Sequence, residues 1–520
     1  MAYLRNIIAH CLFFLLICCW AMPSASQSGS WGKPLVLKAN SFKHYVDYFN
    51  TMEDEPIVQA IPNSESWNWM QQNIPLFECP DKNFERTFYF RWWTLRKHIK
   101  KVESGFVFTE FLVQRSYADK YNLISSGLGH HIYESRWLHN QTYLNDNLRI
   151  WYRDNDGKPL KKLRFYSSWN IDAIYNRYLV NKDDNFIKDF YPDLVEDYKA
   201  WEIEKRNPEG LFWQFDVRDA MEETISGGRK EKNPRPSING YMFGNAKALS
   251  EISTVLNKPE ESRKYQLKAD TIKRLTQQNL WNLKHNFFEV LKEEGDTLSN
   301  VMEEIGFIPW YFNMPDAKYN IAWQHLMNPK HFNAPAGITT ADRSHPGFRT
   351  HGCCKCEWDG AVWPFATAQT LTAMANLLNQ PKQNFVTKND YFAQLKKYAA
   401  SQHKDGKPYI GEYMDEKTGA WLTDDKRGRY YNHSTFNDLV ITGLVGLRPR
   451  ADSVIEVNPL LPAGKWDWFA LDNILYHGKI ITIVWDKTGK KYNRGKGLSV
   501  WADGKKIVSK KILTKVTGQL

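Results

Sequence analysis

Cysteine is scarce in this chain of 520 residues, which contains only seven. Three of the seven fall within the first 26 residues, which leaves four for the rest of the protein. So few cysteines in so long a chain exclude a disulfide-based framework. Cys353, Cys354 and Cys356 lie close together, but three sulfurs without a second pair match a zinc site poorly. We expect them to pack within a small loop.

Long apolar runs are absent after the first 26 residues, so we expect no membrane-spanning helix. Residues 1–26 have the pattern of an export signal. Arg5 precedes an apolar stretch from Ile7 to Trp20, and small residues follow around Ala25. Cys18 and Cys19 would suit a lipoprotein signal, but Ile17 is bulky at the position before them, where such a signal has a small residue. We therefore expect signal cleavage and a secreted or periplasmic protein, in preference to a lipoprotein.

No arm or helix concentrates the basic residues, although the formal net charge is +11. An exported protein whose basic residues are dispersed is not expected to bind nucleic acid. No metal-ligand motif is present either, so we expect no cofactor. A bound calcium ion would leave no recognisable pattern in this sequence, which therefore neither predicts nor excludes one.

Aromatic residues, in contrast, are abundant: they make up 14% of the chain, with 21 tryptophans. Tryptophan and tyrosine offer rigid amphipathic faces on which sugar rings stack, so this excess favours a carbohydrate ligand. The alternative is a helical protein with a core rich in tryptophan, and composition alone does not separate the two.

Carboxylates cluster in the stretch from Phe212 to Tyr241. Within eight positions it contains Asp216, Asp219, Glu222 and Glu223, with aromatic residues before them and a Gly-Gly, Pro-containing loop after them. Glycoside hydrolysis requires one carboxyl group that stays protonated, and an aromatic setting raises a carboxyl pKa. The alternative interpretation is the acidic start of a helix followed by a loop.

Hydrophobic periodicity divides the remaining chain. Apolar residues at helical spacing predict a mainly helical region over residues 84–447, including helices at 241–256, 259–281, 361–380 and 388–402. From residue 448 to 520 the pattern alternates, with Asp-Gly turns, and predicts a small antiparallel β domain. Residues 27–83 show no sustained period, and we expect them to pack on the helical body.

The segment from Gly127 to Asn140 is a further candidate for sugar binding. On a helix, His130, Glu134 and Trp137 fall at positions i, i+4 and i+7, so one face carries a donor, a carboxylate and a stacking ring, with Arg136 beside them.

Two segments resemble family 63-type glycoside hydrolases, which include the mannosylglycerate and glucosylglycerate hydrolases and, more distantly, trehalase. EYMDEKTGAWL, beginning at Glu412, is similar to the E-Y-x-x-x-x-T-G segment of that family. EWDGAVWPFATAQTL (residues 357–371) resembles its W-x-G-x-V-W-P segment, and RDAMEETISGG resembles the region around its catalytic acid. The resemblance covers residues 85–515.

The resemblance implies an (α/α)6 barrel and an inverting reaction, with Asp219 as general acid and Glu412 as general base. Inversion requires the two carboxyl groups to stand roughly 6.5–9.5 Å apart. The chain departs from the family because too few residues precede the helices for an N-terminal β-sandwich. In addition, family members more often have a short polar run such as Asp-Asn-Ser near the acid. Asp216 and Glu222 therefore remain alternative acids.

We therefore predict an exo-acting glycoside hydrolase that cleaves a terminal sugar, α-linked by preference, from an oligosaccharide or other glycoside. The residues expected to contact the sugar combine stacking rings with hydrogen-bonding groups. They are Trp358, Trp363, Trp213, Trp137, Arg136, His130, Asn239 and Tyr413. For each tryptophan, a plain role in the core is the alternative.

Two other functions fit parts of the sequence. A polysaccharide lyase on a helical toroid would use tyrosine and histidine, and Tyr430, Tyr431 and His433 occur together in GRYYNHSTF. An exported glycan-binding protein would also be helical and rich in aromatic residues, but it would need no carboxylate pair.

Overall fold

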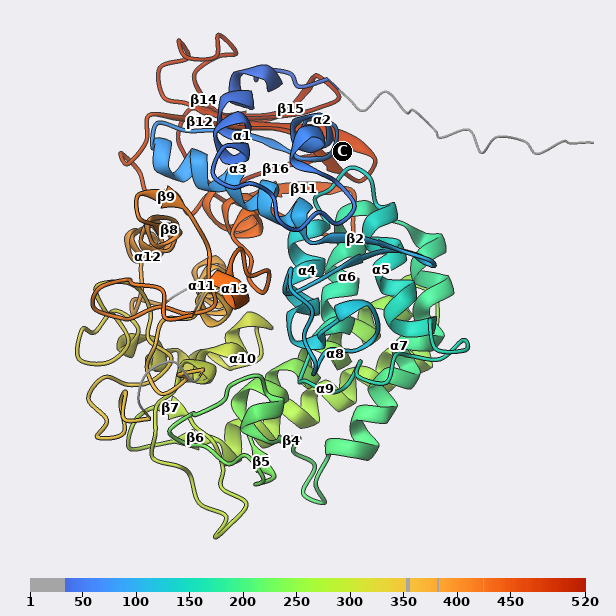
Figure 1. Cartoon of the computed structure of the whole chain (residues 1–520), viewed down its shortest axis with the longest axis vertical. Helices are drawn as coiled ribbons and strands as arrows, with labels where there is room; N and C mark the ends of the chain where they lie inside the picture. The colour runs from blue at the N-terminus through green and yellow to red at the C-terminus, as the bar shows by residue number, and fades with distance from the viewer. Residues whose placement is uncertain (1–32, 352–355, 381–382, 424) are drawn as a thin grey trace, which may run out of the picture. The chain divides into compact units, whose positions relative to one another are not determined.

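Helices form most of the chain and antiparallel β-sheets follow at its C-terminal end (Figure 1), as predicted. This computed structural model describes residues 33–351, 356–380, 383–423 and 425–520, and Lys33–Leu520 form one compact unit. The predicted export signal, Cys353 and Cys354 lie outside the described residues. Among the helices of the described part, none is long and apolar enough to cross a membrane.

Helix α3 (Lys82–Lys97) illustrates why the aromatic-rich segments are helical. Asp81 caps its first turn by accepting hydrogen bonds from the backbone N–H groups of Asn83 and Phe84, and its last turn is basic. Its aromatic side chains are almost all buried. The helical spacing in the sequence reaches Ile99, but that residue instead begins strand β2 (Ile99–Val102).

The four predicted helices are confirmed with small shifts of their ends. Helix α8 (Pro236–Val255) is followed by α9 (Pro259–Asn279), and each begins with a proline, whose fixed φ suits a first helical turn. Helix α11 (Pro364–Asn379) likewise precedes α12 (Lys388–Ser401), which starts with a capping box at Thr387.

Six segments pack side by side in chain order and surround the centre of the view in Figure 1. They are α4 (Leu128–Ser135), α6 (Asn170–Asn181), α8, α10 (Ile308–Tyr311), α11 and the π-helical segment η8 (Leu439–Leu444). Glu134 at the end of α4 accepts hydrogen bonds from the backbone N–H groups of Asn437 (2.9 Å) and Asp438 (3.0 Å). The last segment is thereby tied to the first. We call these six segments the inner helices.

Other helices cover the outside of the inner ones. Helix α7 (Asp184–Lys205) packs on α6 and α8, α9 packs on α8, and α12 lies between α11 and α3. The remaining short elements are α1 (Lys43–Asn50), α2 (Ser66–Asn73), α5 (Thr142–Arg153), α13 (Asp425–Gly428), β3 (Gly105–Phe108), β6 (Trp281–Asn282), β7 (Phe287–Phe288), β8 (His403–Lys404) and β9 (Lys407–Pro408).

The larger C-terminal sheet has five antiparallel strands in the order β1-β12-β13-β14-β15. They are β1 (Leu76–Glu78), β12 (Trp468–Tyr476), β13 (Lys479–Asp486), β14 (Gly497–Ala502) and β15 (Lys505–Lys510). A second sheet joins β10 (Leu447–Arg448), β11 (Val454–Val457) and β16 (Val516–Gln519). Asp503 and Gly504 connect β14 to β15 with positive φ at both positions, the geometry of a tight hairpin turn.

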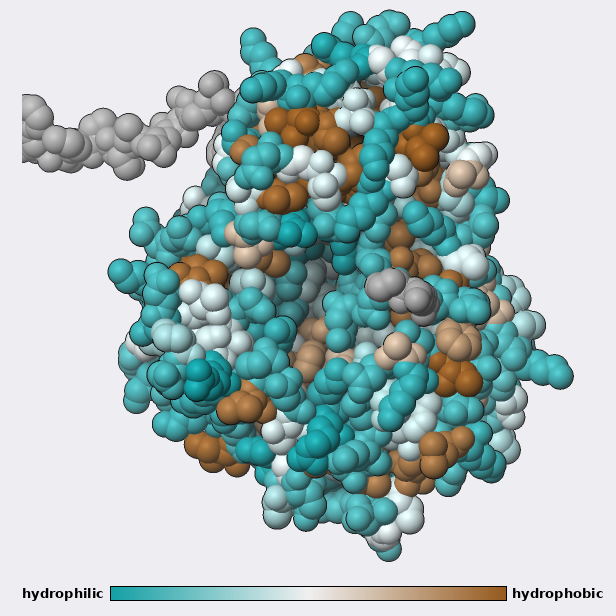
Figure 2. Space-filling model, turned by 180° about the vertical axis from the view of Figure 1, so that it is seen from behind, coloured by the Kyte–Doolittle hydropathy of each residue, from teal (hydrophilic) through white to brown (hydrophobic). Residues whose placement is uncertain are grey.

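The N-terminal segment is anchored to the same sheet. The buried carboxylate of Asp472 accepts hydrogen bonds from the backbone N–H groups of Leu35, Val36 and Leu37, at 3.1, 2.7 and 2.9 Å. Strand β1 then pairs with β12. The face opposite to that of Figure 1 is hollowed near its middle, and its rim is largely hydrophilic (Figure 2).

Candidate active site

The carboxylate-rich stretch is a loop and not the start of an acidic helix. Strands β4 (Trp213–Gln214) and β5 (Asn233–Pro234) pair at its base, and only one short 3-10 turn, Asp216–Arg218, follows β4. Ala220 and Glu223 have φ of +60° and +62°, so the chain turns sharply on both sides of Glu222. The loop leads directly into α8, one of the inner helices.

Three glutamates line a cavity of about 320 Å³: Glu110, Glu222 and Glu412. The cavity lies at the N-terminal ends of the inner helices, because its residues come from the loops that precede them. Besides the glutamates, these residues include Ser126, Phe165, Tyr166, Arg218, Cys356, Trp358, Trp363, Phe365, Arg427, Tyr431 and His433. We call it the carboxylate cavity.

Glu412 is held as an ionised carboxylate. Arg427 donates to both of its oxygens, from Nε to Oε2 at 3.0 Å and from Nη2 to Oε1 at 2.8 Å. Such bidentate pairs are among the stronger hydrogen-bonded interactions in proteins. Burial lowers the pKa of Arg427, but the Glu412 carboxylate more than offsets this and raises it, so the guanidinium stays charged at neutral pH.

Glu222 has the opposite character. The pKa of its carboxyl group is raised to about 7, mainly by burial and in part by the nearby charge of Glu412. At neutral pH a substantial fraction of Glu222 is therefore protonated. One cavity thus brings together a carboxylate that is ionised and a carboxyl that can donate a proton.

Glu110 is a third carboxyl group that the sequence analysis missed. It accepts hydrogen bonds from the Tyr431 hydroxyl and, at 2.9 Å, from the Ser126 hydroxyl. Burial raises its pKa to about 7. Glu110 follows strand β3 in the segment GFVFTEF, where an isolated glutamate after an apolar strand gives no catalytic signal.

Aromatic rings form one wall of the carboxylate cavity. Trp358 and Trp363 both line it and stack with ring centroids 4.5 Å apart. Tyr413 stacks on the other face of Trp363 at 4.7 Å, so it supports the wall from behind and does not line the cavity. The buried indole N–H of Trp358 has no hydrogen-bond partner among the described residues, which leaves it able to donate to a ligand.

His433 adds a neutral imidazole to the same cavity. Its ring lies 3.7 Å from that of Tyr431, centroid to centroid, and both of its nitrogens lack partners among the described residues. Burial lowers the pKa of His433 well below its usual value, so the ring stays uncharged. It can donate or accept one hydrogen bond to a ligand.

Asp219, the carboxylate expected to be the acid, does not line the cavity. Its Oδ2 accepts hydrogen bonds from Arg235 Nε at 2.9 Å and from the Ser237 hydroxyl. The side chains of Asp219 and Arg235 are both fully buried. The ion pair and the hydroxyl thus hold one carboxylate oxygen, while Oδ1 is buried without a partner among the described residues. Asp216, an alternative acid, also lies outside the cavity lining and bonds to the backbone of Val217. Of the three candidates, only Glu222 lines the cavity.

The segment from Gly127 to Asn140, which contains α4, supplies no residue to the carboxylate cavity lining. Arg136 pairs with Asp438 at 2.7 Å, and the Trp137 indole donates to the same carboxylate at 2.7 Å. His130 packs edge-on against Trp169 and Phe365. These three predicted sugar contacts are buried because α4 is an inner helix whose side chains hold neighbouring segments.

Two other predicted contacts also lie outside the cavity lining. Trp213 packs against Phe215, and its ring contacts the ammonium group of Lys205. Asn239 is buried in α8, where its side chain donates to the backbone oxygen of Phe212 at 2.8 Å. Among the described residues, no group of three or more His, Cys, Asp or Glu side chains is placed to hold a metal ion.

Comparison with protein families matches residues 120–434 to the mannosylglycerate hydrolase MGH1-like glycoside hydrolase domain. Residues 447–509 match the C-terminal domain of glycosyl hydrolase family 65. The first match includes Glu222 and Glu412, and the second covers most of the C-terminal sheets.

Solved structures agree with these matches. A sialidase is 55% identical over 93% of this chain with a TM-score of 0.92, and the chain spans only 45% of that protein. The GH63 mannosylglycerate hydrolase of Thermus thermophilus in complex with glucose is 12% identical, with a TM-score of 0.50 over 68% of this chain and 98% of that one. The GH78 family rhamnosidase of Bacillus sp. GL1 is 12% identical, with a TM-score of 0.60 over 84% of this chain and 42% of that one. The last two likenesses concern the fold alone.

Proposed function

The chain belongs to the mannosylglycerate hydrolase MGH1-like glycoside hydrolase family and is a glycoside hydrolase, and we propose that it removes a terminal sugar with inversion of configuration. In this proposal Glu222 is the general acid and Glu412 is the general base. The observation that carries it is the pairing, in one cavity, of an ionised carboxylate held by Arg427 with a carboxyl group whose pKa is about 7. Glu222 takes the role that the sequence pattern suggested for Asp219.

In the proposed reaction, the protonated carboxyl of Glu222 donates to the glycosidic oxygen as the bond to the leaving group breaks. Glu412 removes a proton from a water molecule that attacks the anomeric carbon from the opposite face. A spacing of roughly 6.5–9.5 Å between the two carboxyl groups remains our prediction for the complex with substrate. Trp358 and Trp363 supply a surface for the sugar ring.

Exo action is supported by the size of the carboxylate cavity, because about 320 Å³ suits one sugar ring better than a chain. An α-linked terminal sugar is the first expectation from the family resemblance. The sialidase likeness adds acidic sugars to the substrates to be tested. Because this chain spans 45% of that protein, the name alone does not assign the activity to the shared part.

An (α/α)6 barrel is the architecture we propose for the helical region. The six inner helices that pack in chain order, with Glu134 tying the last to the first, support this arrangement. In such a barrel the carboxylate cavity would occupy the end at which the inner helices begin. We further propose that residues 1–26 direct export, so that the enzyme meets extracellular or periplasmic oligosaccharides.

The test is sugar release from a panel of α- and β-linked glycosides by the purified protein. Glu412→Gln should abolish release, and Glu222→Gln should lower release from glycosides with alcohol leaving groups by about 10²- to 10⁴-fold, both without loss of folding. Glu223→Gln is the matched control, since this neighbouring carboxylate is paired with Arg229 and does not line the cavity. A product with new ultraviolet absorbance would instead indicate a lyase, in which Tyr431 and His433 of the same cavity would act. Glycan binding without release in any variant would leave a binding protein.

A further inference from the structure

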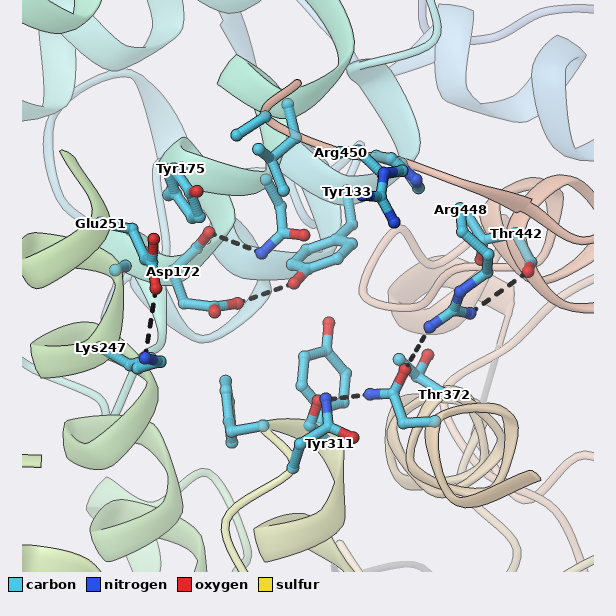
Figure 3. A pocket seen from close by; sticks show the side chains of 18 of the residues that line it. Tyr133, Asp172, Tyr175, Lys247, Glu251, Tyr311, Thr372, Thr442, Arg448 and Arg450 are labelled. Atoms are coloured by element: carbon cyan, nitrogen blue, oxygen red, sulfur yellow. Dashed lines mark hydrogen bonds and ion pairs between the residues drawn. The ribbon is translucent and has the colours of Figure 1, made fainter. Parts of the chain in front are cut away.

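A second cavity, of about 650 Å³, lies among the inner helices (Figure 3) and shares no lining residue with the carboxylate cavity. All six inner helices contribute residues to its lining. In the five that also contribute to the carboxylate cavity, directly or through the preceding loop, the residues of the second cavity come later in the sequence. Tyr133, Asp172, Lys247, Tyr311, Thr372 and Thr442 belong to these helices, and residues 448–452 close one side. Nothing in the proposed reaction uses this cavity.

Most charges around the second cavity are neutralised by a partner. Arg136 pairs with Asp438 at 2.7 Å, Lys247 lies 3.2 Å from Glu251, and Arg450 lies 2.7 Å from Asp452. Arg448 differs. Its guanidinium donates to Asn376 Oδ1 at 2.9 Å and to the Thr442 carbonyl at 3.4 Å. Among the described residues, no carboxylate lies within ion-pair distance of it.

A partly buried guanidinium that has no carboxylate in direct contact is unfavourable, since burial favours its neutral form. The nearest carboxylates, Glu456 and Asp438, instead contact Arg450 and Arg136. Burial lowers the pKa of Arg448, and the nearby charges of Glu456 and Asp438 offset only part of this effect. A bound anion would remove that penalty, and the planar fork of arginine matches a carboxylate with two parallel hydrogen bonds. The cavity therefore offers one position for a negative charge.

The rest of the second cavity has the character of a sugar site. Tyr133, Tyr175, Tyr311, Phe243 and Phe312 supply aromatic surface. The Tyr133 hydroxyl donates to Asp172 at 2.7 Å, and in Figure 3 Asp172 and Arg448 lie on opposite sides of the cavity, with Tyr133 and Tyr311 between them. Carboxylate and amide groups on the far side from Arg448 can accept hydrogen bonds from sugar hydroxyls.

We infer that the second cavity is a non-catalytic binding site for a uronic acid residue, whose carboxylate is held by Arg448 and whose ring packs against the tyrosines. This inference concerns a site separate from the carboxylate cavity and holds whichever glycoside is hydrolysed there.

Calorimetric titration of the full chain with galacturonate, galactose and inorganic phosphate tests this inference. We expect galacturonate to bind at least tenfold more tightly than galactose, which corresponds to about 1.4 kcal/mol. Arg448→Gln should remove that preference. Arg450→Gln is the matched control, because this cavity arginine already has Asp452 and Glu456 as partners, and it should keep the preference.

Glu412→Gln should leave galacturonate binding unchanged, which would separate this site from the carboxylate cavity. If thermal unfolding shows that Arg448→Gln does not fold, Arg448→Lys replaces it, with binding weakened because one donor group replaces the fork. The inference is overturned if galacturonate shows no saturable binding, if phosphate binds as tightly as galacturonate, or if a folded Arg448 variant binds like the wild type.

Discussion

Replacing Glu222 by glutamine gives a prediction that depends on the leaving group of the substrate. The amide fills the same space and keeps a hydrogen-bonding oxygen, but it has no proton to transfer. General acid catalysis contributes about 10²- to 10⁴-fold to a rate, so kcat/KM for a glycoside with an alcohol leaving group should fall by that factor, or about 3–5 kcal/mol.

A dinitrophenyl glycoside of the same sugar separates loss of the acid from general damage. Dinitrophenolate departs without protonation, so Glu222→Gln should retain most of the wild-type rate on this substrate. Glu412→Gln should lose activity on both substrates, because each reaction still needs an activated water. The assay is the initial rate of release of sugar or of dinitrophenolate by folded protein at pH 6.

The pH dependence adds a second readout of the same prediction. Because the acid acts in its protonated form, wild-type activity on the alkyl glycoside should decline as the pH rises through about 7, the pKa to which burial raises Glu222. Glu110 titrates in the same range, and the charge of Glu412 raises the pKa of both carboxyl groups. Equal losses on both substrates in Glu222→Gln, or full activity on the alkyl glycoside, would refute the assignment of the acid.

Four further outcomes are expected. Asp219→Asn should lower the free energy of unfolding by about 3–5 kcal/mol in urea titrations, since it leaves the buried Arg235 without its partner, while the pH profile of the remaining folded enzyme stays unchanged; a shifted alkaline limb would contradict this. Between pH 4.5 and 7 Glu110 keeps its proton in the folded protein but loses it in the unfolded chain. The free energy of unfolding of the wild type should therefore fall by about 3 kcal/mol, relative to that of Glu110→Gln, as the pH rises from 4.5 to 7. Parallel urea curves for the two proteins at both pH values would count against this. Trp358→Phe should raise KM about tenfold with little change in kcat, because a smaller ring gives less stacking area for the sugar, and an unchanged KM would argue for a core role. Arg427→Met should reduce kcat by a factor at least as large as any change in KM, because Glu412 loses its bidentate partner. Wild-type kinetics in this variant would exclude a role for Arg427 in holding the base.

Secondary structure and the general position of the site followed from local patterns. Helices α8, α9, α11 and α12 carry apolar residues at a clear helical period, and proline or a capping residue marks each start. The alternating C-terminal strands and their Asp-Gly turn were equally readable. In the candidate site, Glu412, Trp358 and Trp363 lie in segments whose residues resemble those of a known family.

The choice among the clustered carboxylates required the fold. Asp219 and Glu222 are three positions apart, and only the two residues with positive φ, Ala220 and Glu223, turn one carboxyl toward Arg235 and the other toward the cavity.

Residues that meet across long stretches of sequence gave no local signal. Glu110 and Tyr431 share a hydrogen bond although they are 321 positions apart, and Arg427 reaches Glu412 only through the fold of its loop. Trp137 looked like a sugar contact because His130, Glu134 and Trp137 share one face of the expected helix, with Arg136 beside them. Arg136 and Trp137 instead both donate to Asp438 of a neighbouring segment.

The anomeric configuration of the first sugar released is the most direct test of the central proposal, that Glu222 and Glu412 act as acid and base on opposite faces of the sugar. Proton NMR spectra recorded within the first minutes of hydrolysis distinguish the two anomers before they equilibrate. The proposal predicts that the wild type releases the anomer opposite to that of the substrate and that Glu412→Gln releases none. Release of the anomer with retained configuration, or inversion that persists in Glu412→Gln, would contradict it.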